Sequence, residues 1–225
     1  SQRGPTVSNK KSEIYHSSLK SIQPLTIENA LESFAAEGCN VLKHDVCSSH
    51  GLPKVYERCD VLYSEPAWRA GYQTFQDRAE AKPTTYLDYV QAINRIVKST
   101  TAPLWLIIGS HIIRKIVEPH RKLKVSIHGY DTNLLGWNDE EDYGSFETNY
   151  DFVRLLAQKY DCVGDFCCGY GNTGRLFQEA GKKFVLSDLN GKCVYYVAKE
   201  LLDYNGPGNN PANSEKVESK MQKSR

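Results

Sequence analysis

The sequence lacks long apolar runs, a strong net charge and the paired cysteines or histidines of a metal site. No apolar stretch is long enough to cross a membrane, so we expect no membrane partner. The net charge of +1 gives no strong overall field that would attract polyanions. Seven cysteines are present, but their spacing is not that of a zinc site, and we expect reduced thiols in a cytoplasmic protein without metal.

The rest of the composition is that of an ordinary folded domain with two polar ends. Of the 225 residues, 40% are hydrophobic and 24% are charged. Residues 1–20 are polar and rich in Ser and Lys, which predicts a flexible arm. Residues 206–225 are dominated by polar residues, Gly and Pro, which predicts a disordered tail. We therefore expect a single domain over residues 21–205.

Strand and helix patterns alternate along this domain. The expected strands are 39–45, 59–63, 103–108, 122–128, 134–137, 162–166 and 183–187, and the expected helices are 24–37, 86–98, 112–117, 150–159, 173–180 and 193–202. The alternation predicts an α/β fold, a Rossmann-like and mostly parallel sheet with helices on both faces. Strands 122–128 and 134–137 are close enough to pair across a turn, which would give one antiparallel edge strand.

The most informative segment follows the strand at 162–166 and reads Asp165-Phe-Cys-Cys-Gly-Tyr-Gly171. Gly169 and Gly171 let the backbone turn sharply and approach a ligand closely, and the next helix points its N-terminus at the turn. Asp188 ends the next strand, where a carboxylate can accept hydrogen bonds from a ribose hydroxyl pair. This unit predicts a nucleotide-like cofactor. Because Gly174 completes a dinucleotide fingerprint, NAD remains an alternative.

A second strand, 59–63, runs directly into Ser64-Glu-Pro-Ala-Trp68. Pro66 fixes its own φ and restricts Glu65, so the loop is stiff. The Glu65 carboxylate or the Pro66 carbonyl can accept from a substrate amino group, and Trp68 offers a flat face to a planar ring. Such a loop suits an enzyme that places the amine of a flipped-out base beside a cofactor. The alternative is a plain strand-end turn with Trp68 packed in the core.

Together these two segments resemble the S-adenosylmethionine-dependent methyltransferases that act on amino groups of nucleic-acid bases, the DNA N6-adenine/N4-cytosine family. The cofactor loop of that family reads Asp-x-Phe-x-Gly-x-Gly, from which Asp165 to Gly171 differs by one residue after the Asp. Glu65-Pro-Ala-Trp68 stands where the family has Asp, Asn or Ser, then Pro-Pro and an aromatic residue. The catalytic strand precedes the cofactor strand, as in the circularly permuted, beta-type order of the family.

The resemblance implies S-adenosyl-L-methionine as the cofactor and N6 of an adenine in DNA as the first candidate target. RNA, protein or a small amine as substrate, and a module that has lost catalysis, remain alternatives. The residues that it assigns to catalysis are Ser64, Glu65, Pro66 and Trp68. The residues that it assigns to the cofactor are Asp165, Phe166, Cys167, Cys168, Gly169, Gly171, Asn172, Asp188, Leu189, Asn149 and Tyr150.

Two departures from the family pattern concern the catalytic loop. Glu65 replaces a shorter residue, which moves its carboxylate about 1.5 Å further out. Ala67 replaces the second proline of the motif, whose rigidity helps to aim the acceptor.

Little of the sequence is available for a separate target-recognition domain. The stretch at 129–150 is too short for a separate recognition domain, so recognition would come from loops, from a partner chain or from a homodimer. Phosphate contacts are expected from the basic stretch at 114–124, together with His111 and His120, and a solvated surface is the alternative. The residues proposed for it are Arg114, Lys115, Arg121 and Lys122. A role on DNA would place the protein in the cytoplasm, on the nucleoid or in the nucleus.

Overall fold

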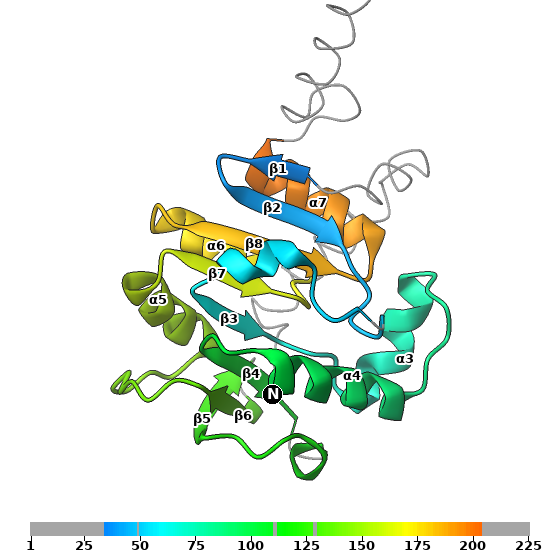
Figure 1. Cartoon of the computed structure of the whole chain (residues 1–225), viewed down its shortest axis with the longest axis horizontal. Helices are drawn as coiled ribbons and strands as arrows, with labels where there is room; N and C mark the ends of the chain where they lie inside the picture. The colour runs from blue at the N-terminus through cyan, green and yellow to red at the C-terminus, as the bar shows by residue number, and fades with distance from the viewer. Residues whose placement is uncertain (1–33, 49, 110–111, 128–129, 204–225) are drawn as a thin grey trace, which may run out of the picture.

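The computed structural model describes residues 34–48, 50–109, 112–127 and 130–203. The predicted arm and tail, the start of the predicted helix 24–37 and His111 lie outside this range. Within it, one eight-stranded sheet has the order β1-β2-β8-β7-β3-β4-β6-β5 (Figure 1). The strands are β1 (Phe34–Ala36), β2 (Cys39–Lys43), β3 (Val61–Ser64), β4 (Leu104–Ile108), β5 (Arg121–Ile127), β6 (Tyr130–Trp137), β7 (Cys162–Asp165) and β8 (Lys183–Asp188).

The middle of the sheet is parallel and its two sides are antiparallel. Strands β2, β8, β7, β3 and β4 run in one direction. Strand β6 runs against both β4 and β5, which confirms the predicted antiparallel pair. The reversed strand β6 is not the edge strand, however. It lies between β4 and β5, and β5 forms the edge of the sheet.

The prediction of a helix reaching residue 37 is wrong for its last residues. Phe34–Ala36 form β1, which pairs antiparallel with β2 at the other edge of the sheet. Glu37 and Gly38 both have positive φ, 48° and 81°, and form a two-residue hairpin turn. A right-handed helix cannot continue through two such residues.

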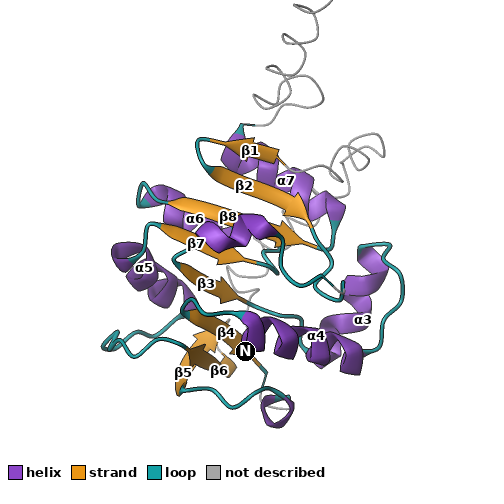
Figure 2. Ribbon diagram, in the orientation of Figure 1, coloured by secondary structure: helices purple, strands orange, loops and turns teal. Residues whose placement is uncertain are grey.

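Helices cover both faces of the sheet (Figure 2). One face packs against α5 (Asn149–Lys159), α6 (Asn172–Glu179) and α7 (Gly191–Leu202), and the other against α3 (Arg69–Arg78), α4 (Tyr86–Ser99) and the 3₁₀ turn η1 (Lys54–Arg58). Alternating strand residues supply the two cores, so that Val61 and Tyr63 join the first and Leu62 joins the second. Among the described helices, none is both long and apolar enough to span a membrane.

Two further segments differ from the prediction. The expected loop after Trp68 contains the helix α3. The expected helix at 112–117 is only a 3₁₀ turn, η2 (Ile113–Lys115). Helices α4 and α5 begin where predicted because Thr85 and Thr148 each start a capping box with the Asp three residues on.

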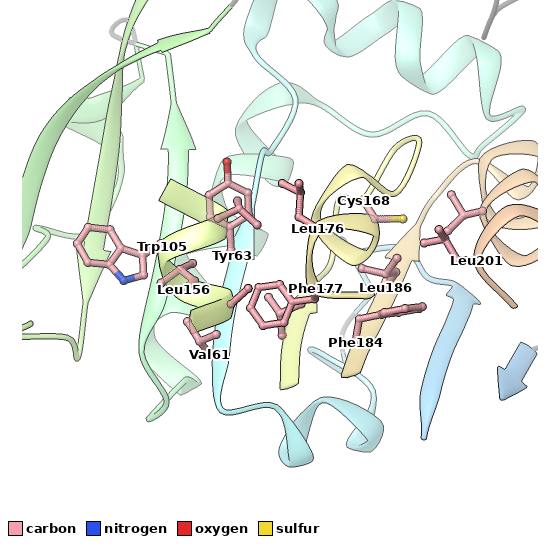
Figure 3. Close-up of a cluster of buried hydrophobic side chains, with 14 of the residues drawn as sticks. Val61, Tyr63, Trp105, Leu156, Cys168, Leu176, Phe177, Phe184, Leu186 and Leu201 are labelled. Carbon is pink, nitrogen blue, oxygen red and sulfur yellow. The ribbon is translucent and has the colours of Figure 1, made fainter. Parts of the chain in front are cut away.

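The core between β3, β7, β8 and the helices α5 to α7 is densely packed (Figure 3). On the other face, Tyr56 lies directly on β7. A Cβ on Gly164 would come within 2.7 Å of the Tyr56 ring, so only glycine allows this contact. The Tyr56 hydroxyl pairs with Ser187 Oγ at 2.6 Å and lies 3.0 Å from the carbonyl oxygen of Asp165. This tyrosine therefore fixes the ends of β7 and β8 relative to each other.

Candidate functional site

A cavity of about 420 Å³ lies at the carboxyl ends of the central parallel strands. This is where open α/β sheets bind ligands, and the volume falls within the usual range for small-molecule sites. Its walls come from the segments that follow β2, β3, β7 and β8, from α3, and from single residues of α4 and α5. The lining residues include His44, Glu65, Ala67, Tyr72, Phe75, Gln76, Arg78, Tyr89, Tyr150, Asp165, Phe166, Cys167, Cys168, Gly169, Asn172, Asp188 and Leu189.

The glycine turn after β7 forms as predicted and leads into α6. Gly169 and Gly171 have φ of 49° and 76°, a left-handed conformation that glycine adopts without strain. A Cβ on Gly169 would meet nothing within 4 Å, so the backbone there is open to a ligand. A Cβ on Gly171 would lie 2.9 Å from Val197, so this glycine is also needed for packing against α7.

Asp165 and Ser64 form the internal support of this turn. Ser64 Oγ donates to Asp165 Oδ1 at 2.6 Å and accepts from the backbone N–H groups of Phe166 and Cys167. Thr173 Oγ1 donates to Asp165 Oδ2 at 2.8 Å. Burial raises the pKa of Asp165 to about 7, although these hydrogen bonds act in the opposite direction. Ser64 is fully buried and does not line the cavity, so the structure gives it a supporting position and no direct contact with a substrate.

Asp188 lies on the cavity wall at the end of β8. Its Oδ2 accepts from the Gly169 N–H at 2.9 Å, and its Oδ1 accepts from the Asn190 N–H at 2.8 Å. Burial raises the pKa of the Asp188 carboxyl above its ordinary value. A carboxylate has about four lone-pair positions, so each oxygen can still accept from a ligand hydroxyl. The predicted ribose contact is compatible with this geometry, and Leu189 lines the wall beside it.

Glu65 also faces the cavity, from the loop that follows β3. Its Oε1 accepts from the Tyr63 hydroxyl at 2.9 Å and from Asn149 Nδ2 at 2.5 Å. Among the groups that the structure describes, no donor reaches the second oxygen, Oε2. Asn149, predicted to contact the cofactor, is buried and bonds to Glu65 instead. Its neighbour Tyr150 lines the cavity, where its hydroxyl lies 3.2 Å from Asn172 Nδ2.

The loop after β3 and the glycine turn are linked by Tyr89 of α4. The Tyr89 hydroxyl accepts from the Ala67 N–H at 2.9 Å and lies 3.6 Å from Cys167 Sγ. Pro66 is buried, and Trp68 is half-buried against the core on the α5 and α6 side. Neither lines the cavity, so the position of Trp68 matches the core-packing alternative better than a stacking surface.

The four basic residues predicted to contact phosphate do not join the cavity. Arg114 and Lys115 are exposed in η2. Arg121 and Lys122 begin β5, and Arg121 pairs with Gly136, which pairs with Trp105 near the start of β4. These two residues therefore lie level with the amino ends of the parallel strands, whereas the cavity lies at their carboxyl ends. Phosphate contacts by this surface remain a prediction.

The sequence interpretation missed Tyr63, Tyr89 and the whole wall formed by α3. All seven cysteines are free thiols. Within the described ranges, no group of three or more His, Cys, Asp or Glu side chains is arranged to hold a metal ion.

Neither a protein-family model nor a curated protein matches the sequence. Solved structures that are similar at low identity include the following two. The crystal structure of an M1.HpyAVI–SAM complex is 10% identical, with coverage of 64% of this chain and 89% of the other and a TM-score of 0.41. TTHA0409 from Thermus thermophilus, a candidate DNA modification methylase, is also 10% identical, with coverage of 66% and 88% and a TM-score of 0.41. Likeness at this level does not establish chemistry, which must be argued from the site.

Proposed function

We propose that this protein is an S-adenosylmethionine-dependent methyltransferase that acts on the exocyclic amino group of a nucleic-acid base, with N6 of adenine in DNA as the first candidate. One observation carries the proposal. The adjacent strands β3 and β7 bring an exposed carboxylate, Glu65, and an open glycine turn onto the walls of one cavity. The amine acceptor and the cofactor turn of such an enzyme must meet in this way.

The residues of the cavity fit this cofactor in three respects. The backbone at Gly169 is open where a Cβ would meet nothing, so a ligand can lie against it. Asp188 follows at the end of the next strand with its carboxylate on the wall, where it would accept from the two ribose hydroxyls. Tyr150 and Asn172 supply polar groups for the amino-acid end. When bound, the cofactor supplies an electrophilic methyl group on its sulfonium.

The contribution of the protein would be to position the amine. Tyr63 and Asn149 hold Oε1 of Glu65, which leaves Oε2 to accept from the amino group of the base. This bond orients the nitrogen lone pair, and Tyr89 keeps the loop in register with the cofactor turn. Orientation and electrostatics of this kind supply much of the rate in enzymes.

A nicotinamide enzyme is the second candidate because of Gly174. A Cβ there would lie 2.4 Å from Leu186, which is the close helix–strand packing of a dinucleotide fingerprint. The arrangement of Glu65 with Tyr63 and Asn149 has no evident use in hydride transfer, which favours the first proposal.

Calorimetric titration separates the two candidates. We expect micromolar binding of S-adenosylmethionine and no binding of NAD. Asp188→Ala should abolish binding, whereas Asp161→Ala should not change it, because Asp161 is an exposed residue that pairs with Lys182 at the opposite edge of the sheet. Binding of NAD alone would turn the interpretation to redox chemistry, and binding of neither would contradict the cofactor assignment.

Transfer of a labelled methyl group to duplex DNA, RNA and protein tests the substrate. Glu65→Ala should abolish transfer and leave cofactor binding intact. Glu65→Gln keeps an acceptor oxygen and should retain part of the activity, and Glu57→Ala, an exposed residue of η1, is a control for surface changes. Unchanged turnover in Glu65→Ala would remove Glu65 from the mechanism.

A further inference from the structure

We propose that the wall of the cavity formed by α3 is a recognition site for a planar base with an amino group. Gln76 and His44 accept hydrogen bonds from the donor edge of the base, and Phe75 packs against its ring. The inference rests on the proposed function and adds how a base would be read, by residues that no motif in the sequence marked.

Gln76 is the first observation. Its side chain is only 6% exposed and lines the cavity, yet its Oε1 has no hydrogen-bond partner in the described part of the chain. A buried acceptor without a donor loses its hydrogen bonds to water without replacing them, and few native groups are left in this state. Gln76 also occupies the buried stripe of α3, between Tyr72 and Ala79 at helical spacing, where an apolar residue would pack at lower cost.

His44 is a second and independent observation, from the end of β2. Its buried Nε2 has no hydrogen-bond partner among the residues that the structure describes, and the residue lines the same cavity. Burial lowers the pKa of His44, whereas a hydrogen bond to the backbone of Gly51 raises it. A neutral ring that gives its N–H to Gly51 presents a lone pair at Nε2, so this atom is also an acceptor. Two unpaired acceptors call for a ligand edge with N–H donors.

Phe75 supplies an apolar surface in the same cavity. It is 52% exposed on the cavity wall, one of two large hydrophobic side chains so exposed in the described part of the chain. Its ring lies back along α3, 2.9 Å from where a Cβ on Gly71 would be, so a larger residue at 71 would displace it. Bases stack readily on such rings, because every base has a π face.

Two sources could supply the base, namely the adenine of the cofactor and the target nucleotide. Helix α3 spans both regions, because it begins directly after the loop of Glu65 and ends near α7, where Lys192 lies 3.8 Å from Glu80. Both sources offer an exocyclic amino group on a planar ring. In the cofactor both N–H bonds of this group are free for Gln76 and His44, whereas a target amine gives one N–H to Glu65 and keeps one for this wall. The binding experiment separates the sources.

The experiment compares the wild type with Gln76→Leu, Phe75→Ala and the control Gln73→Leu, an exposed residue of the same helix. S-adenosylhomocysteine and its inosine analogue are titrated into each protein. Adenosine and inosine are then titrated into the ligand-free proteins and into proteins saturated with S-adenosylhomocysteine. The wild type should prefer the amino form of one ligand, and Gln76→Leu should weaken that form about tenfold, which is the value of one buried hydrogen bond. Phe75→Ala should weaken both forms.

The affected ligand identifies the source. Loss confined to S-adenosylhomocysteine assigns the wall to the cofactor, and loss confined to adenosine assigns it to the target. Gln76→Leu should not lower the melting temperature, because it removes an unpaired buried polar group, whereas a purely structural glutamine would lower it. Equal affinities of wild type and Gln76→Leu for both amino ligands, or no preference of the wild type over inosine, would overturn the inference.

Failure of this inference can be distinguished from failure of the proposed function. If the wild type fails to bind S-adenosylhomocysteine, the proposed function fails. The titration of adenosine against inosine into the ligand-free protein still decides whether the α3 wall reads an amino group.

Discussion

The turn after β7 and the loop after β3 lie side by side at one edge of the sheet, and each carries an acid. Asp165 is 3% exposed, and both of its oxygens accept bonds from the protein. Glu65 is exposed, and both of its described donors reach the same oxygen. The first carboxyl is used to build the turn, whereas the second retains an oxygen for a ligand. The two roles are distinguished by burial and by the number of oxygen lone pairs that the protein occupies. The residue type does not distinguish them, because both are carboxylic acids.

The largest expected effect is a pH dependence of stability that comes from Asp165, the buried acid. The pKa of Asp165 is raised to about 7 in the fold, against just below 4 when unfolded, so between these values the folded state binds the extra proton. The stability that this proton contributes is therefore fully present below pH 4 and is lost as the pH rises through 7. The free energy of unfolding of the wild type should fall by on the order of 4 kcal/mol relative to Asp165→Asn between pH 4 and 8. Urea denaturation between pH 4 and 8 measures this difference. If the free energies of unfolding of the wild type and Asp165→Asn changed in parallel with pH, the raised pKa of Asp165 would be contradicted.

The second prediction concerns the support beneath the turn. Ser64→Ala leaves two buried backbone N–H groups with one partner fewer, so it should lower the free energy of unfolding by about 2–3 kcal/mol. Glu65→Gln keeps an acceptor at an exposed position and should change it by no more than about 0.5 kcal/mol. Equal losses in the two variants would abolish the distinction between the loops.

The third prediction sharpens the role of the exposed acid. Tyr63→Phe and Asn149→Leu each remove one donor from Glu65, and each should reduce methyl transfer about tenfold, the value of a hydrogen bond to a charged group. Cofactor affinity, measured by calorimetry, should stay unchanged in both. Weaker binding of the cofactor by Asn149→Leu, with normal turnover, would instead favour the direct contact between Asn149 and the cofactor that the sequence predicted.

The smallest expected effect lies at the opposite edge of the sheet. The double variant Arg121→Ala and Lys122→Ala should leave cofactor binding unchanged, because neither residue lines the cavity. If both contact phosphate, the slope of log affinity for duplex DNA against log salt should decrease by about 2. An unchanged slope would favour the alternative of a solvated surface.

The local parts of this comparison could be predicted from the sequence. The glycine turn and Asp188 belong to one strand–turn–helix–strand unit, whose glycines and acid lie within 24 residues. The hydrogen bond from Asn149 to Glu65 joins residues 84 apart, and no local pattern predicts it. Helix α3 escaped prediction because Gln76 interrupts its buried stripe, so the apolar period is incomplete. The β1 hairpin was hidden because Glu37 adopts a positive φ, which is uncommon for a residue other than glycine.

The pairing of β3 with β7 joins Val61 to Val163, about a hundred residues further along the chain. Both loops begin where these strands end, so the cavity cannot exist before this distant pairing has formed. A ligand of the cavity will then bind the folded chain and not the unfolded one. At a hundred times its Kd, it would add about 2.7 kcal/mol to the free energy of unfolding. The shift of the melting curve can thus reveal the natural ligand before any reaction has been assayed.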